Sequence, residues 1–145
     1  MSGDFRWPVR VYYEDTDTGG VVYYANYLKF FERARTEWLR RAGIGQQLMS
    51  VQENVMFVVK STAIDYHAPA KLDDPLEVSV IVEKIGRASV NFSQEAWRIS
   101  GSGQELLCSG RIRVGCIDMV SMRPAAIPSA VLEKIKRLNA KANEA

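Results

Sequence analysis

One carboxylate, Asp17, lies in a polar segment that also contains Gly19 and Gly20 and leads into a helical pattern. The glycines allow the backbone to approach a ligand closely. A helix that begins near Tyr24 would leave its first backbone N–H groups unpaired, and its dipole would add partial positive charge there. A carboxylate beside free N–H donors suits the hydrolysis of an acyl group. The donors would stabilise the oxyanion, while Asp17 would activate water or attack the carbonyl itself.

The same segment also has simpler interpretations. An acidic turn with glycines before a helix is a common capped and solvated loop, in which Asp15 would cap or brace the chain. The segment starts like a calcium-binding loop, but the twelfth position is Asn26 rather than a bidentate glutamate. The pattern Asp15-x-Asp17-Thr18 also resembles the nucleophile motif of haloacid-dehalogenase-type phosphatases. Those proteins need a parallel sheet with crossover helices, which the consecutive strands predicted below contradict.

Other reactive residue types are sparse. His67 is the only histidine, and a satisfied or exposed side chain is its simplest interpretation because catalytic histidines usually work in pairs with other groups. No G-x-S-x-G elbow is present, and one histidine with two distant cysteines does not make a zinc site. We expect Cys108 and Cys116 to be buried free thiols. The sequence thus predicts no metal and no other cofactor.

Composition narrows the class of protein. The chain has 145 residues, 47% of them hydrophobic and 25% charged, which fits one globular domain over residues 1–145. Its formal net charge of +2 is too small to indicate a nucleic-acid partner. No segment approaches the roughly 18 apolar residues of a membrane span, and residues 1–8 lack the apolar core of a signal peptide. We therefore expect a cytoplasmic protein without a membrane span.

Hydrophobic periodicity predicts an α+β fold that would position Asp17. Apolar residues recur at the spacing of one helical face through residues 24–42, and Gly43 lies where a C-terminal cap would be. Strands are expected at residues 7–13, 55–66, 76–83, 88–99 and 106–117. A short helix or turn is expected at 45–51 and an amphipathic helix at 129–140. Short turns join the last four strands, so they should be antiparallel neighbours, with the long helix packed on their sheet.

Several segments closely resemble one enzyme family. Residues 10–17, 20–23, 26–27 and 32–35 resemble the Tol–Pal-associated (YbgC-type) acyl-CoA thioesterases, and residues 57–59, 68–70 and 72–74 extend the likeness. That family belongs to the 4-hydroxybenzoyl-CoA thioesterase branch of the hotdog-fold superfamily. The resemblance implies a hotdog fold, in which an antiparallel sheet wraps around a long central helix. It also implies homo-oligomers, dimers or dimers of dimers such as a homotetramer, with active sites at the subunit interface.

The resemblance also implies roles for particular residues. Asp17 matches the family's catalytic aspartate, as general base or nucleophile, and Tyr13 matches the tyrosine that precedes it. The backbone N–H of Tyr24 would polarise the thioester carbonyl, although many relatives have histidine at this position. Further residues are expected to bind the substrate or the phosphates of CoA: Gly20, Val21, Val22, Lys84, Arg87 and Ser89.

Three functions remain open from the sequence. The first is hydrolysis of acyl-CoA, or of acyl carrier protein thioesters. The second is a non-catalytic scaffold that binds an acyl carrier or an envelope partner, since the family's histidine is missing and the C-terminal helix is basic. That helix, with Lys134, Lys136, Arg137 and Lys141, would also suit peripheral contact with the inner membrane. The third, hydration of an acyl thioester, ranks last because His67 lies outside the Asp17 loop.

Overall fold

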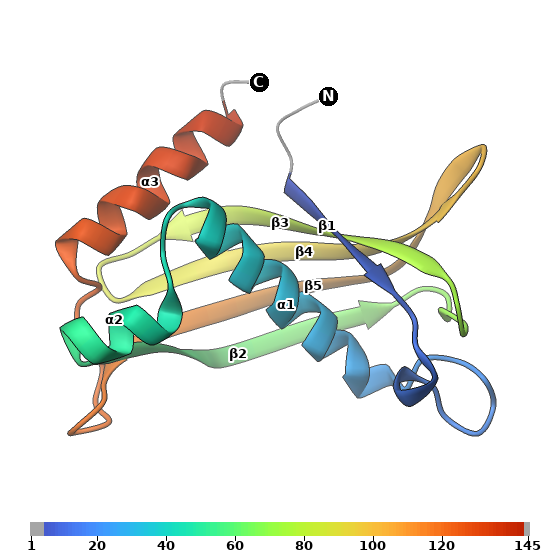
Figure 1. Ribbon diagram of the computed structural model, residues 1–145, viewed down its shortest axis with the longest axis horizontal. Coiled ribbons are helices and arrows are strands. Elements are labelled where there is room, and N and C mark those ends of the chain that lie inside the picture. Colours follow the sequence, from blue (N-terminus) through green and yellow to red (C-terminus); the bar gives the residue numbers. More distant parts are fainter. Residues whose placement is uncertain (1–4, 144–145) are drawn as a thin grey trace.

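A five-stranded antiparallel sheet forms the main layer of the protein, which a computed structural model describes over residues 5–143. The strands lie in the order β1–β3–β4–β5–β2, so consecutive strands β3, β4 and β5 are neighbours and β1 and β2 form the two edges (Figure 1). Their bounds are β1 Phe5–Arg10, β2 Val55–Tyr66, β3 Pro75–Ile85, β4 Ser89–Ser100 and β5 Gly103–Asp118. The antiparallel sheet predicted from the short turns is thereby confirmed.

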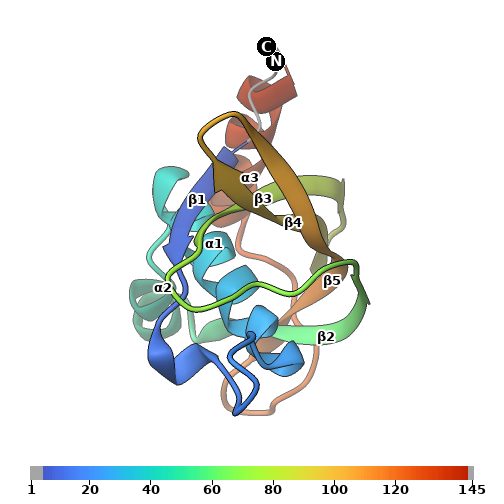
Figure 2. The same cartoon turned by 90° about the vertical axis from the view of Figure 1, so that its right-hand side faces the viewer.

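The long helix α1, Tyr27–Arg41, crosses one face of the sheet, and the sheet curves around it (Figure 2). Its apolar stripe faces the strands, and Phe30 and Phe31 are fully buried. Each such side chain contributes roughly 1.5–3 kcal/mol through burial. At Gly110 of β5, an added Cβ would lie 2.9 Å from the ring of Phe31. A glycine is therefore needed for α1 to pack this closely on the sheet.

Two shorter helices lie at one end of the sheet. Helix α2, Gln46–Glu53, follows α1, and helix α3, Ser129–Asn143, ends the described part of the chain. Both lie at the end where β3 turns into β4, whereas α1 begins at the opposite end (Figure 1). Val131 and Ile135 of α3 are buried in the core. Within residues 5–143, no helix is long and apolar enough to cross a membrane.

The predicted boundaries need two corrections. The first strand covers Phe5–Arg10 rather than 7–13, because the chain leaves the sheet after Arg10 and forms a 3₁₀ turn at Tyr13–Asp15. The long helix does not begin at Tyr24. Residues Tyr24–Asn26 form a separate 3₁₀ turn, and the α-helix starts at Tyr27. At its other end, Gly43 has a φ of 89°, the left-handed conformation expected of a C-terminal cap.

Both cysteines are buried free thiols, as the sequence predicted. They lie on β5, where a spacing of eight residues puts them on the same face of the strand. Burial, with a smaller effect from the charge of Asp65, raises the pKa of the Cys108 thiol to about 12. The thiol therefore stays protonated at neutral pH and behaves as a small apolar side chain.

Candidate active site

Asp15 holds the polar segment to the start of the long helix. Its side chain is only 4% exposed. One carboxylate oxygen accepts the backbone N–H of Tyr12 at 2.8 Å, and the other accepts the side-chain amide of Asn26 at 2.8 Å. The backbone N–H of Tyr23 also donates to the carbonyl of Asp15, at 3.1 Å. Asp15 therefore has the bracing role expected of it, and both of its oxygens are used for structure.

Asp17, two residues further on, lies in a contrasting environment. Its side chain is exposed, and its Oδ1 accepts the backbone N–H groups of Gly19 at 2.8 Å and Val21 at 3.4 Å. Its own N–H donates to the carbonyl of Val21, and Gly20 closes the loop with a φ of 81°. Within residues 5–143, Oδ2 accepts no hydrogen bond. One oxygen thus orients the carboxylate, and the other remains available for a reaction.

Tyr24 follows the loop at the entrance to the 3₁₀ turn. Within the described residues its backbone N–H donates to no acceptor, whereas its carbonyl accepts the hydroxyl of Tyr66 at 3.0 Å. The hydroxyl therefore restrains the orientation of this peptide group. The free N–H predicted at residue 24 is present, although it belongs to the 3₁₀ turn and not to the first turn of the α-helix.

A pocket of about 290 Å³ opens beside Tyr24. Its lining comes from the loop, the start of α1 and the end of β2: Val22, Tyr24, Tyr27, Tyr66, His67, Ala68 and Pro69. The ring of Tyr66 contacts those of Tyr24 and Tyr27, with centroids 6.1 and 5.7 Å apart. Tyr27 is buried, and its hydroxyl accepts the backbone N–H of Ala70 at 3.1 Å. Burial raises the pKa of the Tyr27 phenol, so it remains neutral.

Of the seven residues that line this pocket, the sequence predicted only Val22 and Tyr24 as site residues, and Tyr66 and His67 are the two polar side chains at the end of β2 that it did not place there. Tyr66 ends a predicted strand and had no assigned role. His67 was placed outside the Asp17 loop, which is correct along the chain, but the fold brings it beside Tyr24. Its Nε2 lies 3.0 Å from the hydroxyl of Ser109, so the histidine is paired with a neutral group. The sequence did contain a signal for these residues, because a tyrosine and a histidine follow each other at the carboxyl end of one predicted strand.

Of the other predicted site residues around the loop, Val22 lines the pocket, whereas Val21 and Tyr13 do not. Val22 is buried and lines the pocket, and its N–H donates to the carbonyl of Ala70 at 2.8 Å. Val21 is half-buried and pairs with Lys71 in an isolated bridge. Tyr13 is 82% exposed and does not line the pocket in this single chain. Its carbonyl, by contrast, accepts both the N–H and the hydroxyl of Thr16, so its backbone shapes the turn.

The candidate phosphate-binding residues lie elsewhere. Lys84 and Arg87 are exposed and Ser89 is half-buried, all around the turn between β3 and β4. This turn is at the end of the sheet opposite to the start of α1 (Figure 1). One chain therefore does not bring these residues to the Asp17 loop.

Comparison with known sequences gives one consistent family. The family model described as "Thioesterase-like superfamily" matches residues 11–135. The acyl-CoA thioester hydrolase YbgC of Escherichia coli strain CFT073 is 45% identical over 133 residues, covering 92% of this chain and 96% of that protein. The acyl-CoA thioesterase YbgC of Haemophilus influenzae is 46% identical over 131 residues, covering 90% and 93%.

Solved structures share the same architecture. A probable thioesterase from Bartonella henselae superimposes with a TM-score of 0.75 at 30% identity, over 88% of this chain and all of that one (100%). A 1,4-dihydroxy-2-naphthoyl-CoA thioesterase from Synechocystis gives a TM-score of 0.83 over 97% and 98% of the two chains, and at 21% identity it supports the fold alone. The hotdog fold expected from the sequence is confirmed.

Proposed function

This chain belongs to the thioesterase-like superfamily and is an acyl-CoA thioesterase, and we propose that Asp17 supplies its reactive carboxylate. One observation supports this assignment most directly. Of the two aspartates in the loop, Asp15 is buried with both oxygens hydrogen-bonded, whereas Asp17 is exposed and its Oδ2 accepts no hydrogen bond within residues 5–143. The free N–H of Tyr24 provides a donor for the carbonyl oxygen of the thioester.

In the proposed reaction, the thioester carbonyl accepts the N–H of Tyr24. Negative charge that develops on this oxygen in the tetrahedral intermediate is stabilised by the donor, and one such donor is worth about 2.7–4 kcal/mol. The hydroxyl of Tyr66 holds the Tyr24 peptide in place through its carbonyl. The tyrosine-lined pocket offers apolar surface to the acyl group.

Asp17 does not itself line the pocket of the single chain, and two chemical routes are open to its carboxylate when a thioester is bound at Tyr24. In the first, Asp17 removes a proton from water, the hydroxide attacks the carbonyl carbon, and CoA leaves as a thiolate that takes up the proton. In the second, the carboxylate attacks directly, CoA leaves, and water then hydrolyses the mixed anhydride. A rapid acid quench separates them, because only direct attack puts an acyl group on the peptide that contains Asp17.

Replacement of Asp17 by Asn tests the proposal. The amide oxygen can still accept the N–H of Gly19, so the loop should keep its shape and the melting temperature should change little. The loss of base or nucleophile should lower kcat by about 10²–10⁴-fold. The measurement is thiol release from a panel of acyl-CoA substrates.

The matched control is the same substitution two residues earlier. Asp15→Asn should lower the melting temperature, because a buried carboxylate that accepts two hydrogen bonds loses its charge. Asp17→Asn should instead lower turnover without this loss of stability. Turnover of the Asp17→Asn enzyme within tenfold of the unchanged enzyme would contradict the catalytic assignment.

We also propose that two subunits complete the site. Strand β2 is an unpaired edge of 12 residues, with Val59 exposed, and such an edge readily pairs with another chain. Antiparallel pairing of two β2 edges would reverse the second subunit. Its turn with Lys84 and Arg87 would then lie toward the end of the assembly where the first subunit carries Asp17. This arrangement would supply the phosphate-binding cations that one chain alone does not bring to the loop.

Mixing two inactive variants tests this arrangement. One carries Asp17→Asn, and the other carries Lys84→Ala with Arg87→Ala. In a randomly mixed dimer population, activity at low substrate concentration should recover to about a quarter of that of the unchanged enzyme, because half the dimers contain one intact site of two. If each site belonged to one subunit, mixing would restore nothing.

A further inference from the structure

A buried guanidinium without a counter-charge lies in the middle of α1. Arg35 is only 8% exposed, yet within residues 5–143 it forms no ion pair. Burial lowers its pKa to about 10, and the charge of Glu32 partly offsets this effect. Arg35 is therefore still a cation at neutral pH. Buried charges in proteins are normally paired, so this one calls for an explanation.

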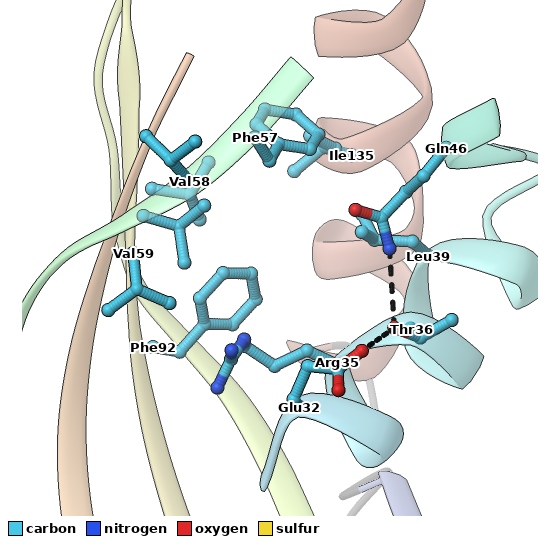
Figure 3. A pocket seen from close by; sticks show the side chains of 12 residues that line it. Glu32, Arg35, Thr36, Leu39, Gln46, Phe57, Val58, Val59, Phe92 and Ile135 are labelled. Atoms are coloured by element: carbon cyan, nitrogen blue, oxygen red, sulfur yellow. Dashed lines mark hydrogen bonds between the residues drawn. The ribbon is translucent and has the colours of Figure 1, made fainter. Parts of the chain in front are cut away.

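Glu32 is the nearest candidate for a counter-charge, but it is engaged elsewhere. Its carboxylate accepts the hydroxyl of Thr36 at 3.3 Å, and that hydroxyl accepts the side-chain amide of Gln46 at 3.2 Å. These three residues form a chain of hydrogen bonds that leads away from Arg35 (Figure 3). The exposed Glu32 lines the same cavity as Arg35, but within residues 5–143 its carboxylate forms no ion pair with the guanidinium.

Gln94 fixes the guanidinium in one orientation. Its side-chain oxygen accepts Nη1 of Arg35 at 2.9 Å. Its amide nitrogen donates to the carbonyls of Phe31 at 3.1 Å and Ser79 at 3.3 Å, which ties the helix to β3. Gln94 is fully buried, and both its side-chain oxygen and its side-chain nitrogen form hydrogen bonds. The guanidinium of Arg35 is therefore held in position before any ligand binds.

The remaining guanidinium N–H groups face an open space. Within the described residues, the only sealed side-chain polar atoms without a partner are Asn91 Oδ1 and Trp97 Nε1, so the unbonded nitrogens of Arg35 keep some access. Arg35 is one of the residues that line a cavity of about 180 Å³ between α1 and the sheet. Figure 3 shows Arg35 extending from the helix toward Phe92 and Val59. Most of the lining is apolar: Leu39, Phe57, Val58, Val59, Val90, Phe92, Val114 and Ile135.

From this cavity we infer a second ligand site, which binds an organic carboxylate through Arg35 and encloses its apolar body. A guanidinium pairs with a carboxylate through two parallel N–H···O bonds, which an alcohol or an amine does not match. An apolar protein cavity of about 150 Å³ is enough for benzene. The volume of about 180 Å³ thus suits an apolar body of about six carbons.

This site shares no lining residue with the pocket beside Tyr24, so the binding of a free acid there does not depend on the role of Asp17. The carboxylate has two chemical sources. It is either a free acid, such as a product of thioester hydrolysis, or the far end of a dicarboxylic acyl group that is still attached to CoA. Both present the same group to Arg35.

Calorimetry with hexanoate on the full-length protein tests the inference. Arg35→Met should weaken binding at least about tenfold, since a hydrogen bond to a charged group is worth that factor or more. The matched control is Arg33→Met, which removes an exposed charge from the same helix and should leave the dissociation constant unchanged. Hexan-1-ol should bind the unchanged protein at least about tenfold more weakly than hexanoate, for the same reason.

A second variant keeps the test valid if Arg35→Met does not fold. Val58→Phe fills the cavity and retains the charge, so it should also abolish hexanoate binding. Comparing adipoyl-CoA with hexanoyl-CoA then identifies the source. A rise in KM for adipoyl-CoA alone in Arg35→Met indicates the dicarboxylic acyl group, and unchanged KM values with lost hexanoate binding indicate the free acid. No hexanoate binding to the unchanged protein, or equal binding in Arg35→Met, Val58→Phe and Arg33→Met, would overturn the inference.

Discussion

The start and the middle of α1 hold their polar groups in different ways. At the start, Asp15 and Asp17 are fixed by hydrogen bonds that span only two to eleven residues of sequence, and Asp17 faces solvent. In the middle, Arg35 is buried and bound to Gln94, which is 59 residues away. Local contacts shape an open site, whereas long-range contacts between elements position a charge in the core.

This difference has energetic consequences. An exposed polar group that is lost is replaced by water at little cost to stability. A buried charge that loses its partner retains its desolvation cost and destabilises the fold. Substitutions at the start of α1 should therefore change activity more than stability, and substitutions around Arg35 should do the reverse.

The largest effect on stability is expected for Gln94→Leu. The substitution leaves Arg35 without its protein acceptor and removes two hydrogen bonds to backbone carbonyls. Leaving a buried polar group without its partner costs about 1–3 kcal/mol, and more when the group is charged, so we expect a loss of about 3 kcal/mol for the Arg35 guanidinium. Urea denaturation gives the free energy of unfolding directly.

Ser93→Ala is the control for this change. Ser93 is the neighbour of Gln94 on β4 but lines a pocket on the other face of the sheet, so its loss should cost well under 1 kcal/mol. If Gln94→Leu costs no more than Ser93→Ala, Arg35 does not depend on its long-range partner. The contrast between the two regions of α1 would then be wrong.

The sequence predicted one region of α1 better than the other for a physical reason. The Asp17 loop is a contiguous motif in which glycines, a carboxylate and a helix start lie within a few residues, so its chemistry can be reasoned locally. The exact start of the helix could not be predicted. It depends on Asn26, whose side chain is held by Asp15, and on Val22, whose N–H is bound by Ala70.

The Arg35 site could not be predicted from the sequence because the residues that line it come from six separate elements: α1, α2, β2, β4, β5 and α3. A signal was nevertheless present. Arg35 follows Phe31 by four residues and precedes Trp38 by three, so it lies within the apolar stripe of the helix. Gln94 likewise alternates with Phe92 and Ala96 on the buried face of its strand. A polar residue on the buried face of a helix or strand is expected to have a hydrogen-bonding partner. The sequence does not show that Arg35 and Gln94 are partners, because their contact depends on how α1 packs on the sheet.

The smallest effect is expected for Tyr66→Phe, at the end of β2, where the ring contacts Tyr24 and Tyr27 at the start of α1. The substitution removes the hydroxyl that donates to the carbonyl of Tyr24 and retains the ring that packs on Tyr24 and Tyr27. One such hydrogen bond is worth about 0.5–1.5 kcal/mol, which corresponds to a fall in kcat/KM of roughly 2–12-fold if it orients the peptide in the transition state. Stability should be almost unchanged, because Tyr66 is exposed.

Steady-state kinetics and urea denaturation of the same preparation measure the change in kcat/KM and the change in the free energy of unfolding separately. Tyr23→Phe is the matched control, since Tyr23 is an exposed tyrosine next to Tyr24 that does not line the pocket. A positioning role for Tyr66 predicts a lower kcat only for Tyr66→Phe, with KM little changed, because the oriented N–H acts on the charge that develops after binding. If the two variants have equal kinetics, the Tyr24 peptide is held by its 3₁₀ turn alone. If Tyr66→Phe instead lowers the free energy of unfolding substantially, Tyr66 stabilises the fold, as Arg35 does.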